Sequence, residues 1–573
     1  MKTSQRWNKK LKRTETGAIR KKWKDRASVA LVFPNFYEVG MANLGFQRVY
    51  AILNSFDEIV CERLFWEGDR ASNSIESGRP LRDFDLICFS ISFELDYLKI
   101  PRILEEQGIP CFSKDRSDAF PLVLAGGIGP SLNPEPIAPF IDAIFIGEFE
   151  TCAEAFRNTI PTLLDTDQPR QRRLLRLIEE VNSFYVPSLY EPKYEADRSV
   201  SHWDIKAGAP FPIEPSWTKE LKEAPKSVIT TPHSIFGNMQ LIEVTRGCGQ
   251  GCRFCAAGFA YRPARQWRID TVKRTIETIG SEVESVGLIG LEFAEDDTIA
   301  EVVDLVERKG LRLSFSSLRA DRITKRFSLF LRKSGAKVAT IAAEAGSERL
   351  RKTINKRLRE DDILRAAEYL SWAGIPNLKM YFMLGLPEED DDDILETIGL
   401  IKKVRDIMAT YGRSRGRLGR LTASFSTFVP KPFTPFQWEK QEDPENLRRR
   451  RALLKKGLSK ISNVKIQLDS IREARLQAVL SRGDRRLANA ISLASKNGID
   501  LEKAVKETGG DFDKYLTGIP DKENMLSWEI IGSRVKRKYL KSEYLKAVKQ
   551  KETPRCKFSG CILCGACKMT SAE

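Results

Sequence analysis

The sequence predicts an α/β protein: a doubly wound domain, then a partial β/α barrel, then a basic helical region that ends in a cysteine-rich tail. Two separate series of short apolar runs that alternate with helical patterns carry this prediction. A length of 573 residues fits three or four domains at roughly 100–200 residues each. We expect a basic tail over 1–25, an α/β domain over 26–165, a connecting segment over 166–235, the barrel over 236–430, basic helices over 431–550 and the cysteine tail over 551–573.

The first series of apolar runs begins at Ser28 and predicts a parallel sheet covered by helices. Continuous rather than alternating apolar residues are typical of strands that are buried on both faces. Such runs cover residues 28–34, 84–92, 121–129 and 143–148. In doubly wound sheets the binding loops follow the carboxyl ends of the strands. The proline-studded stretch over about 165–235 reads instead as a connection with little core of its own.

The second series begins at Met239 and predicts a parallel β/α barrel, full or partial. Its apolar runs include MQLIEV, GLIGLEFA, LRLSFSSLR, KVATIAAEAG and LKMYFMLG, which gives about six strand–helix repeats up to residue 430. The active site of such a barrel lies at the carboxyl ends of its strands. A loop rich in proline and aromatic residues over 428–438 leaves the barrel, and the following region is helical and basic.

Composition narrows the class of protein. Lys and Arg total 94 against 78 Asp and Glu, a net charge of +16, and His202 and His233 are the two histidines. This scarcity argues against a histidine-rich zinc hydrolase. No apolar run approaches the roughly 20 residues of a membrane span, and the basic first residues lack the apolar core of an export signal. We therefore expect a cytoplasmic protein without membrane contact, whose clustered cysteines bind metal.

Three cysteines follow the first strand of the predicted barrel. Cys248, Cys252 and Cys255 have the spacing C-x3-C-x2-C in what we name the first cysteine loop, residues 247–255. Three thiolates so close together can hold three irons of a 4Fe–4S cluster and leave the fourth iron open to a ligand. A zinc site would need a fourth ligand, and His233 lies 15 residues before Cys248. We favour the cluster, as the catalytic centre, over zinc or merely buried cysteines.

At these residues the sequence resembles the radical S-adenosylmethionine (radical SAM) superfamily over roughly 239–430. The resemblance implies that the open iron binds S-adenosylmethionine and that one electron cleaves it to a 5′-deoxyadenosyl radical. Residues 343–356 resemble a motif of tRNA methylthiotransferase-like members. The implied binding residues are Phe254 and Gly385 for the adenine, Glu292 for the methionine amino group (in Gly-Leu-Glu where the family has Gly-Gly-Glu), Glu344 and Ser347 for the ribose or methionine, and Lys356 for the carboxylate.

The N-terminal α/β domain resembles the cobalamin-binding domain that precedes many radical SAM enzymes. Where cobalamin domains with a lower histidine ligand read Asp-x-His-x-x-Gly, this sequence has Asn35, Tyr37 and Gly40. Tyrosine is a poor cobalt ligand at neutral pH, since its ordinary pKa is about 10. A loop with Gly126 and Gly127 could approach a corrin or a phosphate, or be a plain glycine turn. Either the domain binds cobalamin without a protein histidine or it no longer binds it.

A second set of cysteines lies near the end of the sequence. The C-terminal cysteine segment, residues 551–567, carries the spacing C-x4-C-x2-C-x2-C. Four cysteines make a complete zinc or iron site, but serial C-x2-C pairs are typical of ferredoxins, so we favour an auxiliary 4Fe–4S cluster over zinc. It would relay electrons or bind substrate. The four are Cys556, Cys561, Cys564 and Cys567; the remaining Cys61, Cys88, Cys111 and Cys152 read as small core residues.

The whole arrangement over 26–573 resembles a bacterial group of radical SAM proteins without an assigned substrate. It predicts an enzyme that functionalises a C–H bond, first of all a methyltransferase that acts through cobalamin on a large substrate. One alternative is a cobalamin-independent isomerisation, dehydrogenation or sulfur insertion that uses the terminal cluster. Another is a non-catalytic iron–sulfur factor that binds RNA. We expect an electron donor such as flavodoxin or ferredoxin.

Positive charge suggests the class of substrate. It gathers in the N-terminal tail, in Arg448–Arg451 with Lys455 and Lys456, and between Arg534 and Lys557, where Tyr539 and Tyr544 are interleaved. Basic stretches can follow a phosphate backbone, and tyrosines can stack on unpaired bases. A solvated helical face is the other explanation. With the net charge of +16, we expect RNA or a ribonucleoprotein, or a ribosome-associated protein, as partner.

Overall fold

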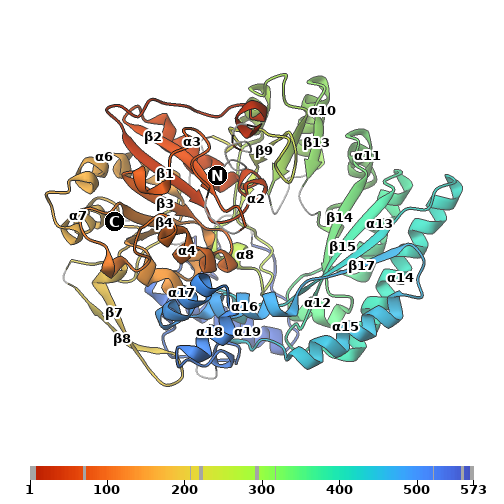
Figure 1. Ribbon diagram of the computed structural model, residues 1–573. Helices are drawn as coiled ribbons and strands as arrows, with labels where there is room; N and C mark the ends of the chain where they lie inside the picture. Colours follow the sequence, from red (N-terminus) through yellow and green to blue (C-terminus); the bar gives the residue numbers. More distant parts are fainter. Residues whose placement is uncertain are drawn as a thin grey trace. The chain divides into compact units, whose positions relative to one another are not determined.

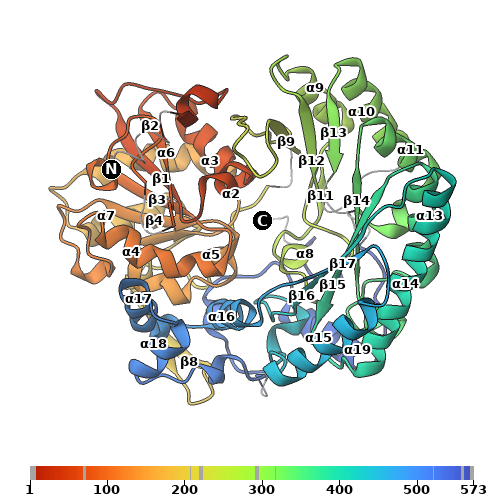
Figure 2. The same ribbon diagram turned by 45° about the vertical axis from the view of Figure 1, so that its right-hand side comes forward.

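The chain forms two compact units, shown in Figures 1 and 2. The computed structural model describes residues 8, 10–68, 72–206, 208–218, 223–290, 296–315, 318–519, 522–556 and 561–567. The sheet unit, as we name it, comprises Met1–Glu220, Pro225–Gln240 and Leu476–Ser533. The barrel unit comprises Leu221–Ala224, Leu241–Arg475 and Arg534–Glu573. Among the helices that the structure describes, none has the length and apolar character that crossing a membrane requires.

A six-stranded sheet forms the core of the sheet unit, in the order β2-β1-β3-β4-β5-β6. Its first five strands pair in parallel, and β6 pairs antiparallel with β5. The predicted doubly wound fold is thereby confirmed, and four of its strands match the four predicted runs. The strands are β1 (Ala27–Phe33), β2 (Ile59–Phe65), β3 (Leu86–Ser90), β4 (Leu122–Gly126), β5 (Ala143–Phe145) and β6 (Phe184–Tyr185).

The strand order reverses between β1 and β3, which makes this point the topological switch of the sheet. Ligands of doubly wound sheets bind outside the carboxyl ends of the strands at such a point. The helices α2 (Tyr37–Met41), α3 (Leu44–Ser55), α4 (Ile100–Glu105), α5 (Ile128–Leu132), α6 (Ala153–Leu164) and α7 (Arg170–Glu180) belong to this unit, with a hairpin of β7 (Tyr190–Tyr194) and β8 (Val200–Ile205). The sheet therefore draws on residues beyond 165.

Residues 476–533, far along the sequence, pack against this N-terminal sheet domain. They contain α17 (Ala488–Asn497), α18 (Leu501–Glu507) and most of α16 (Ile471–Arg482). The backbone N–H of Arg102 donates to Ser495 Oγ at 3.2 Å, and Asn133 Nδ2 donates to the carbonyls of Ser481 and Gly483 at 3.0 and 2.8 Å. Part of the region that we expected as basic helices thus completes the first unit.

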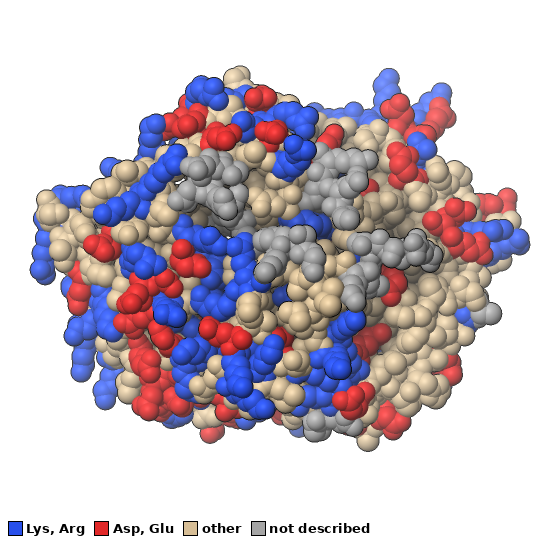
Figure 3. All heavy atoms as spheres, turned by 180° about the vertical axis from the view of Figure 1, so that it is seen from behind, with Lys and Arg blue, Asp and Glu red and all other residues tan. Residues whose placement is uncertain are grey.

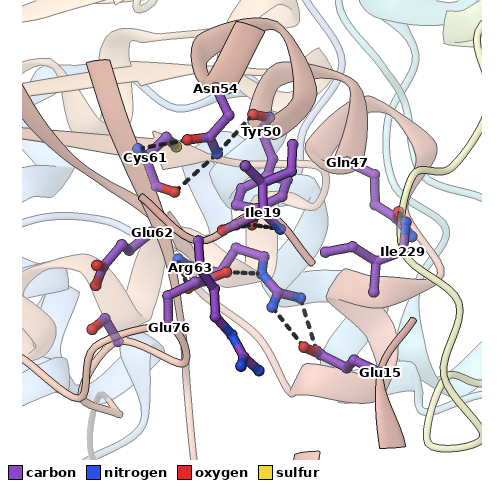
Figure 4. A network of polar contacts seen from close by, with 12 residues as sticks. Glu15, Ile19, Gln47, Tyr50, Asn54, Cys61, Glu62, Arg63, Glu76 and Ile229 are labelled. Atoms are coloured by element: carbon purple, nitrogen blue, oxygen red, sulfur yellow. Dashed lines mark hydrogen bonds and ion pairs between the residues drawn. The ribbon is translucent and has the colours of Figure 1, made fainter. Parts of the chain in front are cut away.

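The N-terminal tail is anchored on the sheet unit, unlike a free basic arm. Leu11 is fully buried, and Thr16 pairs with Thr230 in an antiparallel bridge. Glu15 lies 2.8 Å from the guanidinium of Arg63, which is fully buried and also pairs with Glu76 at 2.6 Å (Figure 4). A buried cation needs such partners because it has lost its water. The tail carboxylate is therefore part of the core.

In the described part of the barrel unit, seven strands form an open, partial barrel. A three-stranded sheet in the order β13-β12-β9 and a four-stranded sheet in the order β14-β15-β16-β17 are connected by a parallel bridge between Leu318 and Ile341. The predicted partial barrel is confirmed. The strands are β9 (Met239–Glu243), β12 (Ser285–Ile289), β13 (Arg312–Phe315), β14 (Val338–Glu344), β15 (Asn377–Leu384), β16 (Leu421–Thr427) and β17 (Val464–Leu468).

Buried and less buried side chains alternate along these strands, which is typical of a sheet that is covered by helices on one side. In β16 every second side chain is buried, and the rings of Phe382 and Phe425 stack at 5.1 Å across neighbouring strands. The last strand, β17, lies within the region that we expected to be helical. The helices are α9 (Ile269–Glu277), α10 (Asp296–Arg308), α11 (Lys325–Lys333), α12 (Glu348–Thr353), α13 (Glu360–Trp372), α14 (Asp391–Ser414), α15 (Pro444–Leu458) and α19 (Arg537–Val548).

Candidate active site

The first cysteine loop leaves the barrel just after β9 and is closed by a short strand pair. β10 (Thr245–Arg246) pairs antiparallel with β11 (Arg265–Gln266), and α8 (Ala256–Ala260) begins directly after Cys255. Gly247 and Gly251 have φ values of +77° and +74°. A Cβ at Gly247 would lie 2.4 Å from the Tyr261 carbonyl oxygen, so this position requires glycine. The loop is thereby folded tightly on itself.

The three thiols of this loop suit iron–sulfur ligation in their chemistry. Cys252 is buried, Cys248 and Cys255 are half-buried, and the Cys255 N–H donates to the Cys252 carbonyl at 3.1 Å. Burial, together with the charge of Cys252, raises the pKa of Cys255 to about 11. Among the described residues, no three His, Cys, Asp or Glu side chains already form a metal cage. Binding of a cluster would therefore gather the thiols and release their protons.

Two buried cations lie beside the thiols. Lys356 is 6% exposed and its Nζ lies 3.0 Å from Glu344 Oε1. Burial alone would lower the pKa of Lys356, but Glu344 and Cys252 more than offset this effect and raise it. Burial also opposes the charge of Arg319, whose pKa is raised by Asp321 and by Cys252. Both cations thus stay charged and favour thiolates or an anionic ligand next to the loop.

Sequence reasoning missed Arg319. Its guanidinium pairs with Asp321 at 2.9 Å and donates to the Lys356 carbonyl at 3.3 Å. It follows β13, the third strand of the barrel, where a polar residue at a strand end is the usual signal for a site. No motif spacing marks it in the sequence. The structure adds Arg319 to the candidate site.

The backbone next to Lys356 is unusual and touches the first cysteine loop. Glu344, Asn355 and Arg357 have positive φ values of 67°, 54° and 51°. Asn355 Nδ2 donates to the Gly251 carbonyl at 3.0 Å, and Arg357 Nη2 donates to the Gln250 carbonyl at 2.9 Å. Non-glycine residues adopt such conformations where surrounding contacts enforce them, often at functional sites. The loop after β14 and α12 therefore braces the first cysteine loop.

Other residues expected to bind S-adenosylmethionine have mixed outcomes. Phe254 is half-buried and packs against an apolar cluster that includes Leu386 and Phe428. Ser347 is fully buried: its hydroxyl caps α12 by accepting the Leu350 N–H at 3.2 Å and donates to Asp393 at 2.5 Å. We therefore correct its expected role from ligand binding to structure.

Gly385 and Glu292 complete this set. Gly385 is required by its φ of +77° and by Glu442, whose Cβ would lie 2.9 Å from an added Cβ. Its N–H donates to Glu389 Oε2 at 2.7 Å, so this amide is not available to an adenine. Glu292 lies outside the described residues. The residues brought together at the first cysteine loop are thus Cys248, Cys252, Cys255, Glu344, Lys356 and Arg319.

The C-terminal cysteine segment lies against the first cysteine loop within the same unit. The Cys556 N–H donates to the Gly249 carbonyl at 2.8 Å, and the Thr553 N–H donates to Asn355 Oδ1 at 2.9 Å. The guanidinium of Arg253, fully buried, donates to the Lys551 carbonyl at 2.6 Å and pairs with Glu543 at 3.1 Å. The backbone of Cys556 therefore contacts the loop that carries Cys248, Cys252 and Cys255.

The residues expected at a cobalamin site lie in the sheet unit, at the carboxyl end of β1 and β4. Tyr37 is buried and its hydroxyl donates to Glu15 at 2.6 Å. Gly40 is packed by Phe65, whose ring would lie 2.4 Å from an added Cβ. Gly127 has a φ of +107°, and its Cβ would lie 2.3 Å from the Ile91 carbonyl oxygen. Tyr37, Gly40 and Gly127 therefore have structural roles here.

Unlike Tyr37, Gly40 and Gly127, the residues around Asn35 leave groups that a ligand could contact. Asn35 Nδ2 and Lys99 Nζ both donate to Asp96 Oδ1, at 2.9 and 2.8 Å. The other carboxylate oxygen, Asp96 Oδ2, is buried and has no hydrogen-bond partner among the residues that the structure describes. Phe36 and Phe93, which follow β1 and β3, are each 47% exposed. Gly126 is half-buried, with ordinary contacts around it. An unsatisfied buried acceptor and two exposed rings thus lie at the topological switch.

The basic stretches are partly neutralised within the chain. In α15, Arg450 is buried and pairs with Glu442 at 2.7 Å, while Arg449 pairs with Asp391. The Tyr539 ring lies 5.6 Å from the Arg262 guanidinium, and the Tyr544 ring packs on Trp438 at 6.2 Å. Both tyrosines are half-buried and have contacts within the chain, and stacking on bases stays a prediction. On the face in Figure 3, Lys and Arg are interspersed with Asp and Glu.

Comparison with known proteins agrees with this site. Residues 45–187 match the family described as radical SAM proteins, N-terminal, and residues 242–401 match the radical SAM superfamily. The uncharacterized protein MJ0966 of Methanocaldococcus jannaschii is 28% identical over 86% of this chain and 97% of its own length. The tRNA-2-methylthio-N(6)-dimethylallyladenosine synthase of a Ruegeria species is 24% identical over 52% of this chain and 61% of its own length.

A solved structure provides a further comparison. The radical S-adenosylmethionine methyltransferase TsrM from Kitasatospora setae, with cobalamin and a [4Fe–4S] cluster bound, is 12% identical, with a TM-score of 0.48 over 84% of this chain and 99% of that one. The second family match begins with the strand before the first cysteine loop and runs through α13 into α14, so it contains the three thiols, Lys356 and Arg319. By these matches and this loop, the chain belongs to the radical SAM superfamily.

Proposed function

We propose that this radical SAM enzyme is a cobalamin-dependent methyltransferase that modifies RNA. The observation that carries the proposal is the switch point of the sheet unit, where Asp96 Oδ2 is buried beside Asn35 and no described residue donates to it. The amide side chains of a corrin could donate to such an acceptor, and the exposed rings of Phe36 and Phe93 would cover its apolar surface. When bound, the iron–sulfur cluster with S-adenosylmethionine supplies radical chemistry and cobalamin supplies the methyl group.

The residues of the barrel unit would hold the first cofactors. Cys248, Cys252 and Cys255 are the thiols for the cluster. Lys356 and Arg319 present positive charge to the carboxylate of S-adenosylmethionine, and Glu344, already paired with Lys356, is the acceptor for its amino group or ribose. Phe254 offers an apolar surface to the adenine. These side chains bind and orient the ligand next to the thiols.

In the sheet unit, the contacts of Tyr37 support the proposal that cobalamin would bind without a protein side chain as ligand to cobalt. Its hydroxyl is fixed on Glu15, which itself pairs with Arg63. Burial and the Glu15 charge raise the pKa of Tyr37 far above its ordinary value, so it does not ionise at neutral pH. A neutral phenol that already donates to Glu15 is not available as a metal ligand, so this position would hold cobalamin without a protein ligand to cobalt.

RNA is our first candidate for the substrate. The name of the Ruegeria relative, a tRNA-modifying synthase, supports it, as does the net charge of +16. Arg448, Lys455 and Lys456 remain exposed on α15. A ribosome-associated protein is the competing substrate, and transfer of label from methyl-labelled S-adenosylmethionine to RNA or to protein separates the two.

A second function is favoured by two observations. Tyr37 stands where a histidine would bind cobalt, and the Ruegeria relative is named as a methylthio synthase. We infer from them, as the competing proposal, a radical modification without cobalamin, such as sulfur insertion that uses the C-terminal cysteine segment. It predicts turnover that does not depend on added cobalamin.

The test is reconstitution of the purified protein with iron and sulfide, followed by reaction with dithionite and S-adenosylmethionine, with and without hydroxocobalamin. The proposal expects 5′-deoxyadenosine and S-adenosylhomocysteine, and the visible bands of bound cobalamin. Asp96→Asn, which replaces the unpartnered acceptor by an amide, should weaken cobalamin binding at least about tenfold. The exposed Asp167→Asn is the matched control. Wild-type protein that retains no cobalamin contradicts this proposal and favours the second function.

A further inference from the structure

We infer that the loops at the amino ends of four barrel strands form a docking surface for the phosphate backbone of a folded RNA. This inference rests on the proposed RNA substrate, but not on methyl transfer or on cobalamin. The loops are residues 332–337, 373–376, 413–420 and 459–465, which precede or begin β14, β15, β16 and β17. We name them the amino-end loops. They lie outside the basic stretches that the sequence singled out.

The amino-end loops carry charge of one sign. They contain nine Lys or Arg and no Asp or Glu. The loops at the other ends of β15 and β16, residues 385–390 and 428–443, contain six Asp or Glu and two Lys. Like charges that are held close together repel one another and destabilise the folded chain, and a bound polyanion removes this repulsion. The positive charge of these strands is therefore concentrated at one end, as a polyanion would require.

Parallel pairing brings the amino-end loops together at one edge of the sheet. β14, β15, β16 and β17 pair in this order (Figure 1), and neighbouring strands lie about 4.8 Å apart, so their four starts span roughly 15 Å. Asn377 connects two loops: its Nδ2 donates to the Lys337 carbonyl at 3.1 Å, and its Oδ1 accepts the Arg420 N–H at 3.0 Å. A Cβ at Gly419 would lie 1.6 Å from the Pro376 carbonyl oxygen. The loops thus form one continuous surface.

Most cations of this surface are not neutralised within the chain. Lys333 pairs with Glu307 on α10. Exposed cations that pair with no carboxylate among the described residues include Arg332, Lys337, Arg413, Arg417 and Arg420. This differs from α15, where Arg450 and Arg449 are paired with acidic residues. Cations without partners can bind phosphates without first breaking an ion pair, and each contact releases counterions from the nucleic acid.

Two guanidinium groups converge on Gly374, in the loop before β15. A Cβ added there would lie 3.6 Å from Arg332 Nε and 3.7 Å from Arg415 Cζ. Arg415 donates to the carbonyls of Ser371 and Trp372, which fixes its position at the end of α13. The Trp372 side chain is 38% exposed. Guanidinium groups bind phosphate oxygens through two parallel hydrogen bonds, and an exposed indole can stack on an unpaired base. These groups favour RNA over an acidic protein.

The position of this surface indicates the size of the RNA. The first cysteine loop lies at the other end of the strands, where Lys356 is influenced by Cys252 and pairs with Glu344, the last residue of β14. β14 has seven residues at about 3.3 Å each, so its two ends are about 23 Å apart. A mononucleotide could not reach both ends, whereas a folded RNA with a stem could. Backbone contacts of this kind orient an RNA without reading its sequence.

The test measures binding of bulk tRNA to the full reconstituted chain by filter binding at several salt concentrations. Arg413→Gln/Arg417→Gln/Arg420→Gln removes three cations from the surface and should raise the Kd at least about tenfold. The slope of log K against log salt should decrease by about 2–3, since up to three phosphate contacts are lost. The matched control, Arg82→Gln/Arg172→Gln/Lys506→Gln, removes the same charge from exposed positions of the sheet unit. Its Kd should stay within about twofold of wild type.

The possible outcomes distinguish this inference from the proposed function. Wild type that binds tRNA no more tightly than the triple variant, or equal losses in both triple variants, would overturn the docking surface alone. Wild type that binds no tRNA would overturn the RNA substrate as well. Binding to phosphatidylglycerol vesicles that only the surface variant loses, with unchanged tRNA affinity, would assign the surface to a membrane instead. Because tRNA binding needs neither cobalamin nor turnover, failure of methyl transfer would leave a positive result valid.

Discussion

The sheet unit and the barrel unit of this chain present the loops at their strand ends in different ways. In the barrel unit, the loop after β9 carries three thiols, with Lys356 and Arg319 beside them. In the sheet unit, the loop after β1 carries Tyr37, whose hydroxyl is held by Glu15. At the strand ends of the barrel unit, thiols and charged groups lie next to one another. At the strand ends of the sheet unit, Tyr37 stands at the position of the cobalamin motif but is buried and bonded within the protein. Similar architecture therefore leaves the chemistry of an edge to be decided by individual side chains.

This difference distinguishes residues that take part in the reaction from residues that stabilise the fold. The barrel edge depends on charge held next to thiols, so single substitutions there should remove activity with little loss of stability. In the sheet unit, Tyr37 is bonded to the buried ion network of Glu15, Arg63 and Glu76. Substitutions in this network should therefore change stability and leave the radical chemistry intact. The five predictions that follow test this contrast, from the largest expected effect to the smallest.

Cys252→Ala should abolish formation of 5′-deoxyadenosine. The first cluster would keep two thiol ligands from its loop, and iron should fall from about eight to about four per chain. Product analysis by chromatography and iron assay check both statements, with Cys152→Ala as the control. Undiminished formation of 5′-deoxyadenosine would contradict the assignment of Cys252 as a ligand of the catalytic cluster.

Arg63→Leu should destabilise the sheet unit by about 3–5 kcal/mol, because it leaves Glu15 and Glu76 buried without their cation. Thermal and urea unfolding measure the loss. Adding Glu15→Gln and Glu76→Gln to Arg63→Leu should recover part of the stability, since the unpaired charges are then removed. A triple variant as unstable as the single one would show that packing, not charge, sets the cost.

Stability should also depend on pH through Glu389. Burial raises the pKa of Glu389 to about 8, against the Gly385 N–H and Arg450, which lower it. Since the folded pKa exceeds that of the unfolded chain, the group contributes no penalty below about pH 4.5, and stability falls as pH rises to about 8. The loss is on the order of several kcal/mol. Unfolding of wild type and Glu389→Gln across this range measures it; equal slopes would refute the assignment.

Lys356→Met should weaken binding of S-adenosylmethionine by about 10–100-fold, because a charged partner of the ligand is lost and Glu344 is left unpaired. Calorimetric titration of the reconstituted protein measures this. Lys356→Arg keeps the charge and should retain most of the affinity. Equal loss in both variants would point to the shape of the loop around Asn355 instead of charge.

Tyr37→Phe should cost about 1 kcal/mol in the sheet unit, since one hydrogen bond to Glu15 is lost while the ring still packs on Phe65. The absorbance of bound hydroxocobalamin should be unchanged, because this residue does not ligate cobalt. A shifted spectrum would show that Tyr37 reaches the metal after all, and it would remove the contrast between the two edges.

The sequence predicted those features of the structure that are determined by residues close together in the chain. Apolar runs identified β1, β3, β4 and most barrel strands, and the C-x3-C-x2-C spacing identified the first cysteine loop. Spacing and composition did not reveal the partners. Tyr37 and Glu15 are 22 positions apart, and Asn355 and Thr553 are 198 apart.

The same limit explains the misassigned residues. Ser347 followed a family motif, yet its hydroxyl donates to Asp393, 46 positions later. β17 was hidden in a basic stretch because its strand, VKIQL, is short and only half-buried. Contacts over long sequence separation decide such cases, and a single sequence does not contain them.

The path of the chain between its two units has a consequence for biosynthesis. Residues 476–533 return to the sheet unit before residues 534–573 complete the barrel unit. As the chain emerges from the ribosome, the strands of each unit are made before other segments that belong to the same unit, so neither unit can finish folding in the order of synthesis. The Cys556 N–H can donate to the Gly249 carbonyl only after residues 250–555 have been made. The first cysteine loop therefore lacks this contact during most of its own synthesis and gains it only when the C-terminal cysteine segment arrives.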